Sequence, residues 1–246
     1  MGLRGMLTKD HLGFSMPSSG PLYPKPPYRY RGASMIVFEY VTDGPSAAGL
    51  LPAQAELTDP PVAGLVFADY PESTLGPYRE VVLYLHATYQ GKPIQYAAYL
   101  YVTTDVAMAA GREMGGFPKK IAAISFDDAG TIAGTLQRPE GLPLASGSLR
   151  PVGEPVQAPD STLDYLTLRI IPSPTRDAPP SVSELLETGW SMSNTQVWQG
   201  DGSCTIEPGS ENDPLHLLPV VKLLGCKLVR CDLEVSANET SRSQPL

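Results

Sequence analysis

The sequence predicts a mainly β (α+β) fold, an antiparallel sheet closed like a barrel around a pocket and accompanied by a few short helices. Three observations support this prediction. Short runs of β-branched and aromatic residues recur along the chain, separated by turn formers. The 23 glycines and 26 prolines, about a fifth of the 246 residues, disfavour long helices. The apolar fraction of 42% is sufficient for a substantial core.

The first 34 residues are rich in turn formers and are expected to form an extended arm. Five prolines lie between Pro17 and Pro27, and proline favours extended backbone in the residue before it. The first strand is predicted over residues 35–41, ending at a turn that begins at Asp43. Further strands are predicted over residues 62–68, 80–88, 93–103, 121–126, 131–137, 165–171, 195–198 and 227–235.

Helices are expected at two places. Residues 105–110 form an alanine-rich segment with Asp105 as a candidate N-cap, and Gly111 or the pair Gly115–Gly116 would end the helix. A second short helix is predicted over residues 182–187. No linker divides the chain, so we expect one domain over residues 1–246, with a polar, disordered tail over 236–246.

Composition and charge exclude several classes of partner. The net charge of −8 and the absence of a basic cluster argue against nucleic acid, and no apolar run is long enough to span a membrane. No apolar segment follows the first nine residues, so we expect no secretory signal and a cytoplasmic location. The three cysteines lack metal-site spacing and are expected to be reduced core thiols: Cys204, Cys226 and Cys231.

Motifs for other chemistry are also missing. The three histidines, His11, His86 and His216, lie far apart and show no metal-ligand spacing. The sequence contains no nucleophile elbow, P-loop or dinucleotide fingerprint, so hydrolase and nucleotide-binding functions have no support.

Two adjacent lysines, Lys119 and Lys120, are the strongest candidates for chemistry. Only seven lysines occur in the chain, and apolar residues flank this pair. If the segment is extended, the two side chains point to opposite faces, so one can be buried while the other faces away. Burial and a nearby like charge both lower the pKa of an amine, and a neutral amine attacks carbonyl carbon to form a Schiff base. The alternative is a solvent-exposed lysine pair in a turn.

The surrounding segment, Gly111-Arg-Glu-Met-Gly-Gly-Phe-Pro-Lys-Lys120, resembles the motif that carries the Schiff-base lysine of the acetoacetate decarboxylase family. Residues 73–80, Ser-Thr-Leu-Gly-Pro-Tyr-Arg-Glu, resemble the family segment that bears an active-site glutamate. Weaker similarities follow in the family's order at residues 24–30, 170–172, 197–200 and 214–219, so the resemblance covers roughly residues 12–235.

The resemblance implies roles for individual residues. Lys119 would condense with a substrate ketone, Lys120 would help to depress its pKa, and Glu80 would handle protons or orient the substrate. Such an enzyme decarboxylates a β-keto acid and needs no metal or organic cofactor. Family members assemble as homo-oligomers, and self-association is implied on that ground alone.

Substrate contacts are expected from Phe117 in the motif and from Arg29 or Arg31. Bacterial members of the family carry a further arginine and a second acid, which an ungapped count places at Ala33 and Leu65. Arg29 or Arg31 would replace the arginine, whereas nothing nearby replaces the acid. We therefore expect a keto acid larger or more apolar than acetoacetate.

Two alternatives remain open at this point. The family also contains aldolase–dehydratases, which use the same lysine to activate pyruvate toward aldehydes. A protein of another class, a non-catalytic barrel that binds an apolar small molecule, would also suit the low charge and the aromatic strands. Arg112 and Glu113, within the motif, are expected to form a structural ion pair.

Overall fold

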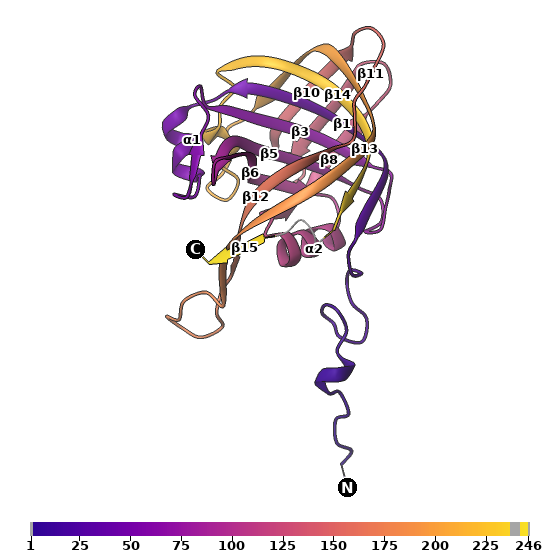
Figure 1. Cartoon of the computed structure of the whole chain (residues 1–246), viewed down its shortest axis with the longest axis vertical. Coiled ribbons are helices and arrows are strands. Elements are labelled where there is room, and N and C mark those ends of the chain that lie inside the picture. The colour runs from indigo at the N-terminus through magenta and orange to yellow at the C-terminus, as the bar shows by residue number, and fades with distance from the viewer. Residues whose placement is uncertain (1, 237–241, 246) are drawn as a thin grey trace.

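A computed structural model describes residues 2–236 and 242–245 and shows a mainly β chain with two α-helices and two short 3-10 helices in that part (Figure 1). The helical segments are η1 (Lys9–His11), α1 (Gly44–Leu50), α2 (Asp105–Gly115) and η2 (Leu215–Leu217). The strands are β1 (Tyr28–Val41), β2 (Ala55–Leu57), β3 (Val62–Tyr70), β4 (Glu72–Ser73), β5 (Tyr78–Tyr89), β6 (Lys92–Val102), β7 (Lys119–Ile121), β8 (Ala123–Asp127), β9 (Ile132–Gln137), β10 (Pro143–Pro151), β11 (Val156–Gln157), β12 (Ser161–Ile171), β13 (Val182–Ile206), β14 (Lys222–Val235) and β15 (Arg242–Pro245).

Seven strands form a closed ring. Their order is β12-β6-β5-β3-β1-β14-β13, and β13 pairs back with β12. All neighbours in the ring are antiparallel except β12 and β6, which are parallel. The prediction of a mainly β, barrel-like fold with few helices is therefore confirmed, and the parallel pair is the departure from a purely antiparallel sheet.

Side chains of the ring strands point alternately to the two faces of the sheet and form a separate hydrophobic core on each face. On β1, Met35 and Val37 face one core, whereas Ile36, Phe38 and Tyr40 face the other. Successive side chains of a strand point to opposite faces, so the same division runs through the other ring strands. The first face encloses the candidate site. The second face packs beneath β8, β9 and β10, which continue the sheet from β13.

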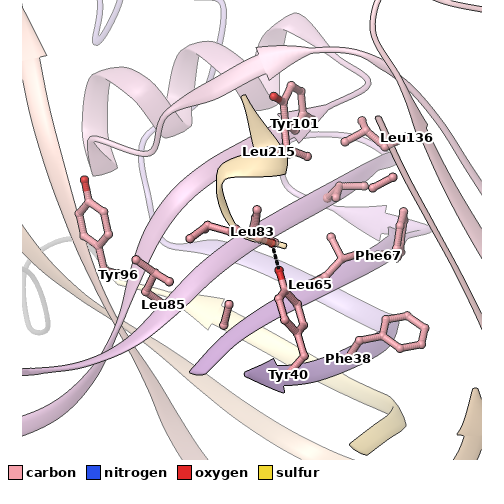
Figure 2. Close-up of a cluster of buried hydrophobic side chains, with 14 of the residues drawn as sticks. Phe38, Tyr40, Leu65, Phe67, Leu83, Leu85, Tyr96, Tyr101, Leu136 and Leu215 are labelled. Atoms are coloured by element: carbon pink, nitrogen blue, oxygen red, sulfur yellow. Dashed lines mark hydrogen bonds between the residues drawn. The ribbon is translucent and has the colours of Figure 1, made fainter. Parts of the chain in front are cut away.

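Figure 2 shows the core on the second face, where large aromatic and aliphatic side chains meet. The hydroxyl of Tyr40 donates to the carbonyl of Leu218 at 3.1 Å, so a fully buried phenol has a partner. Phe67 packs directly against Gly134 of β9, where a Cβ would lie 2.4 Å from the ring. This core fixes the outer surface of the ring and leaves the inner face free for a cavity.

The helix over α2 is confirmed, but its cap differs from the prediction. The side chain of Thr104, rather than Asp105, accepts from the backbone N–H of Ala107. Gly116 ends the helix in the left-handed region at φ 63°, a conformation that favours glycine. None of the helices in residues 2–236 is long and apolar enough to cross a membrane.

The predicted helix over residues 182–187 is wrong, because this segment is the start of β13. It pairs residue by residue with β12, from Val182 opposite Ile171 to Glu187 opposite Leu166. Tertiary pairing here outweighs local propensity. The strand β10 and the helix α1 were also not predicted, nor were the short elements η1, β2, β4, β11 and η2. Asp43 caps α1 by accepting from the N–H of Ser46 at 2.9 Å.

Both ends of the chain differ from the expected boundaries. The first strand begins at Tyr28 rather than at residue 35, so the arm is seven residues shorter than predicted. In Figure 1 the arm runs away from the sheet towards the N-terminus. Of the predicted disordered tail, residues 237–241 and 246 lie outside the described residues, whereas residues 242–245 pair with β13 as β15.

Candidate active site

Lys119 opens β7, a three-residue strand that pairs in parallel with β6 and places Lys119 opposite Leu100. Two contacts tie this strand and the residue Phe117 just before it to α2. The backbone N–H of Phe117 donates to the carbonyl of Gly111 at 3.1 Å, and the Arg112 guanidinium donates to the carbonyl of Lys119 at 3.2 Å. The helix end and its glycine cap therefore determine where the lysine side chain begins.

The stem of Lys119 lies against the surface of α2 at Gly111. A Cβ at residue 111 would lie 2.4 Å from Cδ and 3.1 Å from Nζ of Lys119, closer than side chains normally approach. Only glycine at this helix position leaves space for the stem in its present course.

The amine of Lys119 is buried with a carboxylate. Lys119 is 3% exposed, and its Nζ lies 2.8 Å from Oε2 of Glu80, which is 2% exposed. The rings of Tyr78 and Phe117 each have their centroid 5.7 Å from Nζ. A buried amine in contact with a single carboxylate and two aromatic rings has exchanged most of its hydration for these partners.

Three buried tyrosines lie near the carboxylate of Glu80. Tyr70 approaches Oε1 of Glu80 at 3.5 Å, and the hydroxyl of Tyr78 donates to that of Tyr30 at 3.2 Å. Burial, and next the charge of Glu80, raise the pKa of Tyr70 well above its ordinary value; burial likewise raises the pKa of Tyr78. These phenols remain protonated at neutral pH, so they are neutral hydrogen-bond donors.

Lys120 points away from Lys119, as the alternation predicted, and does not share its surroundings. Its amine contacts Oδ1 of Asp213 at 3.1 Å and the carbonyl of Asn212. The buried carboxylate of Asp213 also accepts from Tyr101 at 3.0 Å and from Arg138 at 3.2 Å. The charge of Lys120 is thus paired on the other side of β7, and its influence on Lys119 remains a prediction.

Two hollows adjoin the lysine–glutamate pair. The smaller, about 40 Å³, lies between α2, the end of the arm at Pro26 and β13, and Lys119 lines it. The larger, about 330 Å³, lies inside the ring of strands, and Glu80 lines it. Phe117 and Trp190, whose rings meet edge to face at 6.0 Å, line both hollows. Phe117, expected to contact substrate, therefore borders both hollows.

Two polar groups beside Lys119 were not found from the sequence. Thr188 and Trp190 on β13 line the small hollow, and within the described part of the chain neither Oγ1 of Thr188 nor Nε1 of Trp190 has a hydrogen-bond partner. Buried polar atoms normally have partners, so both are available to a ligand. No local motif marked these two residues. The segment before them was predicted as helix, so their position on a strand beside the site was not foreseen.

The two arginines expected to contact substrate are not brought to the site. Arg29 pairs with Glu234 at 2.7 Å and Arg31 with Asp232 at 2.9 Å, and both side chains are more than half exposed. They occupy the outward positions of β1, alternating with the buried Tyr28 and Tyr30. Alternation along the strand therefore excludes either guanidinium from the hollows.

Ala33 and Leu65 are the positions where the ungapped count placed the additional arginine and the second acid of bacterial family members. The two positions have different surroundings. Ala33 belongs to the core on the cavity side, whereas Leu65 belongs to the core on the other face. An acid at Leu65 would not point toward Lys119, so the count alone does not locate a replacement.

The expected ion pair between Arg112 and Glu113 is not present among the described residues. Arg112 holds the carbonyl of Lys119, whereas Glu113 accepts from the hydroxyl of Tyr23 in the arm at 2.6 Å. Both residues have the structural role that was expected, with different partners.

Comparison with known proteins gives the class and then the family. The chain is 30% identical over 233 residues to Decarboxylase DEC1 of Cochliobolus heterostrophus, covering 91% of this chain and 92% of that protein. It is 29% identical over 231 residues to Acetoacetate decarboxylase 2 of Mesorhizobium japonicum, covering 91% and 86%. These relatives define the class as decarboxylases, enzymes of the lyase kind. The family model for acetoacetate decarboxylase matches residues 15–244. The chain belongs to the acetoacetate decarboxylase family.

Solved structures support the same fold. An acetoacetate decarboxylase superposes with a TM-score of 0.84 at 20% identity, covering 97% of this chain and 98% of that one. The enduracididine biosynthesis enzyme MppR, solved with the condensation product of pyruvate and imidazole 4-carboxaldehyde, superposes with a TM-score of 0.79 at 20% identity, covering 98% of each chain. At these identities the likeness establishes the fold alone.

Proposed function

We propose that this protein decarboxylates a β-keto acid through a Schiff base on Lys119, with a substrate larger or more apolar than acetoacetate. The single observation that carries the proposal is the contact of 2.8 Å between Nζ of Lys119 and Oε2 of Glu80, both buried beside a cavity. Family membership supports the decarboxylase class.

The reaction begins with a proton transfer within the buried pair. When the proton of the ammonium passes to Glu80, Lys119 becomes a neutral amine and Glu80 a neutral acid, which removes two charges from a site with little solvation. The amine then adds to the ketone carbon of the substrate, and loss of water gives an iminium ion. Glu80 is placed to donate to the departing oxygen.

Carbon–carbon cleavage follows from the iminium. The bond to the carboxylate carbon breaks, carbon dioxide leaves, and the bonding electrons form a neutral enamine with the iminium nitrogen. Protonation of the enamine carbon and hydrolysis by water release the ketone and restore the amine. The surrounding tyrosine and phenylalanine rings suit this step, because positive and negative charge are neutralised as the bond breaks.

The substrate carboxylate would lie in the small hollow beside Lys119. Thr188 and Trp190 supply two neutral donors there, and among the described residues that line the hollow only Lys119 is charged. Neutral donors orient a carboxylate without the strong charge stabilisation of an arginine, so they oppose its loss less.

Reductive trapping tests the proposal. Acetoacetate and a longer β-keto acid are supplied with borohydride, and peptide mapping is expected to find the added mass on Lys119 alone. Lys119→Ala should lose trapping and carbon dioxide release. Glu80→Gln should lower kcat about 100-fold in protein that is still folded by circular dichroism, although the loss of a buried ion pair lowers its melting temperature. Full turnover by Lys119→Ala would refute the mechanism.

Two other outcomes would favour the alternative functions. Condensation of pyruvate with an aldehyde, without carbon dioxide release from any keto acid, would assign the chain to aldol chemistry. A ligand that binds without being trapped by borohydride would indicate a non-catalytic carrier.

A further inference from the structure

The large hollow is an apolar chamber inside the ring of strands. Its volume is about 330 Å³, and each of the seven ring strands contributes to its wall. The wall is built mainly from apolar side chains, such as those of Met35, Val66, Val82, Leu100, Val197 and Val229. A cavity of this size and character is in the range that binds small organic molecules.

One end of the chamber adjoins the reacting pair, and the other end is polar and open. Glu80 lies at the first end. At the other end are Glu39, Gln199 and Lys227; Gln199 is exposed and Glu39 is partly exposed. The hydroxyl of Tyr84 donates to Glu39 at 3.4 Å, which places Tyr84 at the polar end.

The length of the chamber follows from the strand that runs along it. Glu80 and Tyr84 are four residues apart on β5, which corresponds to about 13 Å at about 3.3 Å per residue. An extended chain advances by about 1.1–1.2 Å per bond, since three backbone bonds span one extended residue. The chamber therefore matches a chain of about eleven bonds.

The volume also allows a chain of this length. At about 330 Å³ the chamber is far larger than the space that one water molecule needs. The group attached to the ketone of acetoacetate is a single methyl, which would leave most of this apolar space unfilled. Burial of each further methylene removes apolar surface from water and so favours binding.

We propose that the chamber binds the acyl chain of the substrate, and that the substrate class is β-keto acids with a chain of about ten carbons beyond the ketone. This proposal rests on the Schiff-base function of Lys119 given above. The ketone carbon lies at Lys119, the carboxylate in the small hollow, and the chain passes Phe117 and Trp190 into the ring. The carbons of a longer chain extend out of the chamber at its polar end, so they remove no further apolar surface from water.

A series of chain lengths tests the proposal. Carbon dioxide release is measured for saturated β-keto acids of 4, 8, 12 and 16 carbons. We expect kcat/KM to rise by about threefold for each methylene up to about 12–14 carbons and then to level off. A value of kcat/KM that is flat or falls between 4 and 8 carbons would overturn the proposal, while leaving the Schiff-base function intact if acetoacetate is turned over.

A variant that fills the chamber gives the matched comparison. Val66→Phe adds a ring to the chamber wall, and Val156→Phe makes the same change at an exposed position on β11. We expect the ratio of kcat/KM for the 12-carbon acid to that for the 4-carbon acid to fall at least tenfold in Val66→Phe and to be unchanged in Val156→Phe. An equal ratio in both variants would refute the assignment of the chamber.

A binding measurement separates the two proposals. Calorimetry with dodecanoate and butanoate needs no turnover, and we expect dodecanoate to bind the wild type at least 100-fold more tightly and to weaken in Val66→Phe. If no keto acid is decarboxylated or trapped, the Schiff-base function fails, and this titration still decides whether the chamber takes a chain. Equal affinity for the two acids would exclude it.

Discussion

Replacement of Gly111 by alanine is a sharp test of how the site is built, because it adds one methyl group against the stem of Lys119. The new Cβ would lie 2.4 Å from Cδ of the lysine, so the stem must move by about 1 Å to reach an ordinary contact distance of about 3.5 Å. The stem is flexible and can give way without disturbing the core. The cost therefore falls on the position of Nζ relative to Glu80 rather than on the fold.

The magnitudes follow from this geometry. A misplacement of about 1 Å at a reacting group costs about 100-fold in rate, so kcat/KM should fall by about two orders of magnitude. Alanine is favoured over glycine within a helix by about 1 kcal/mol, so the free energy of unfolding of Gly111→Ala should be unchanged or higher. Carbon dioxide release and a urea titration measure the two effects.

Gly49→Ala in α1 is the control for helix propensity, because nothing lies within 4 Å of a Cβ at that position. It should keep full kcat/KM. Wild-type turnover by Gly111→Ala would refute the claim that the path of the Lys119 side chain past residue 111 sets the position of Nζ relative to Glu80. A strong loss of stability would refute the claim that the lysine side chain moves while the core stays in place.

Three further outcomes are expected. Thr188→Val, which removes an unpaired donor from the small hollow, should raise KM about tenfold and leave the melting temperature unchanged; an unchanged KM would remove the hydroxyl from substrate binding. Asp213→Asn, at the centre of a buried cluster, should lower the melting temperature by about 5 °C, whereas an unaltered melting curve would show that the cluster adds no stability. The pKa of Asp232 is lowered in the folded chain by the N–H of Gly32 and by its other donors, so its stabilisation is present above about pH 4 and is lost as the pH falls through the lowered value. Asp232→Asn should therefore destabilise at pH 7 and less at pH 3; an equal effect in urea titrations at both pH values would contradict this.

Local pattern was sufficient for the fold class, and it raised the lysine pair as a candidate that the resemblance to a family motif then favoured. Strand-forming runs between glycine and proline turns identified most of the ring strands, because a half-buried strand leaves its period of two in the sequence. The same period predicted that Lys119 and Lys120 face opposite sides of β7. Resemblance to a family motif selected Glu80, whose contact with Lys119 the structure then displayed.

The errors share one physical cause. Residues 182–187 have helix-compatible composition, but the pairing partner in β12 is distant in sequence and outweighs that preference. Arg29 and Arg31 appeared suited to bind substrate, yet the register of β1 turns them outward to carboxylates of β14. Neither partner strand is visible in the local sequence.

The sequence by itself therefore determined most of the ring strands and which of their faces are apolar, since propensity and alternation act over a few residues. Only the tertiary structure decided that Glu80 meets Lys119 across 39 positions of chain, that Asp213 instead pairs with Lys120, and that seven strands close around a chamber. These outcomes depend on the register and closure of strands far apart in sequence, and no local preference encodes them.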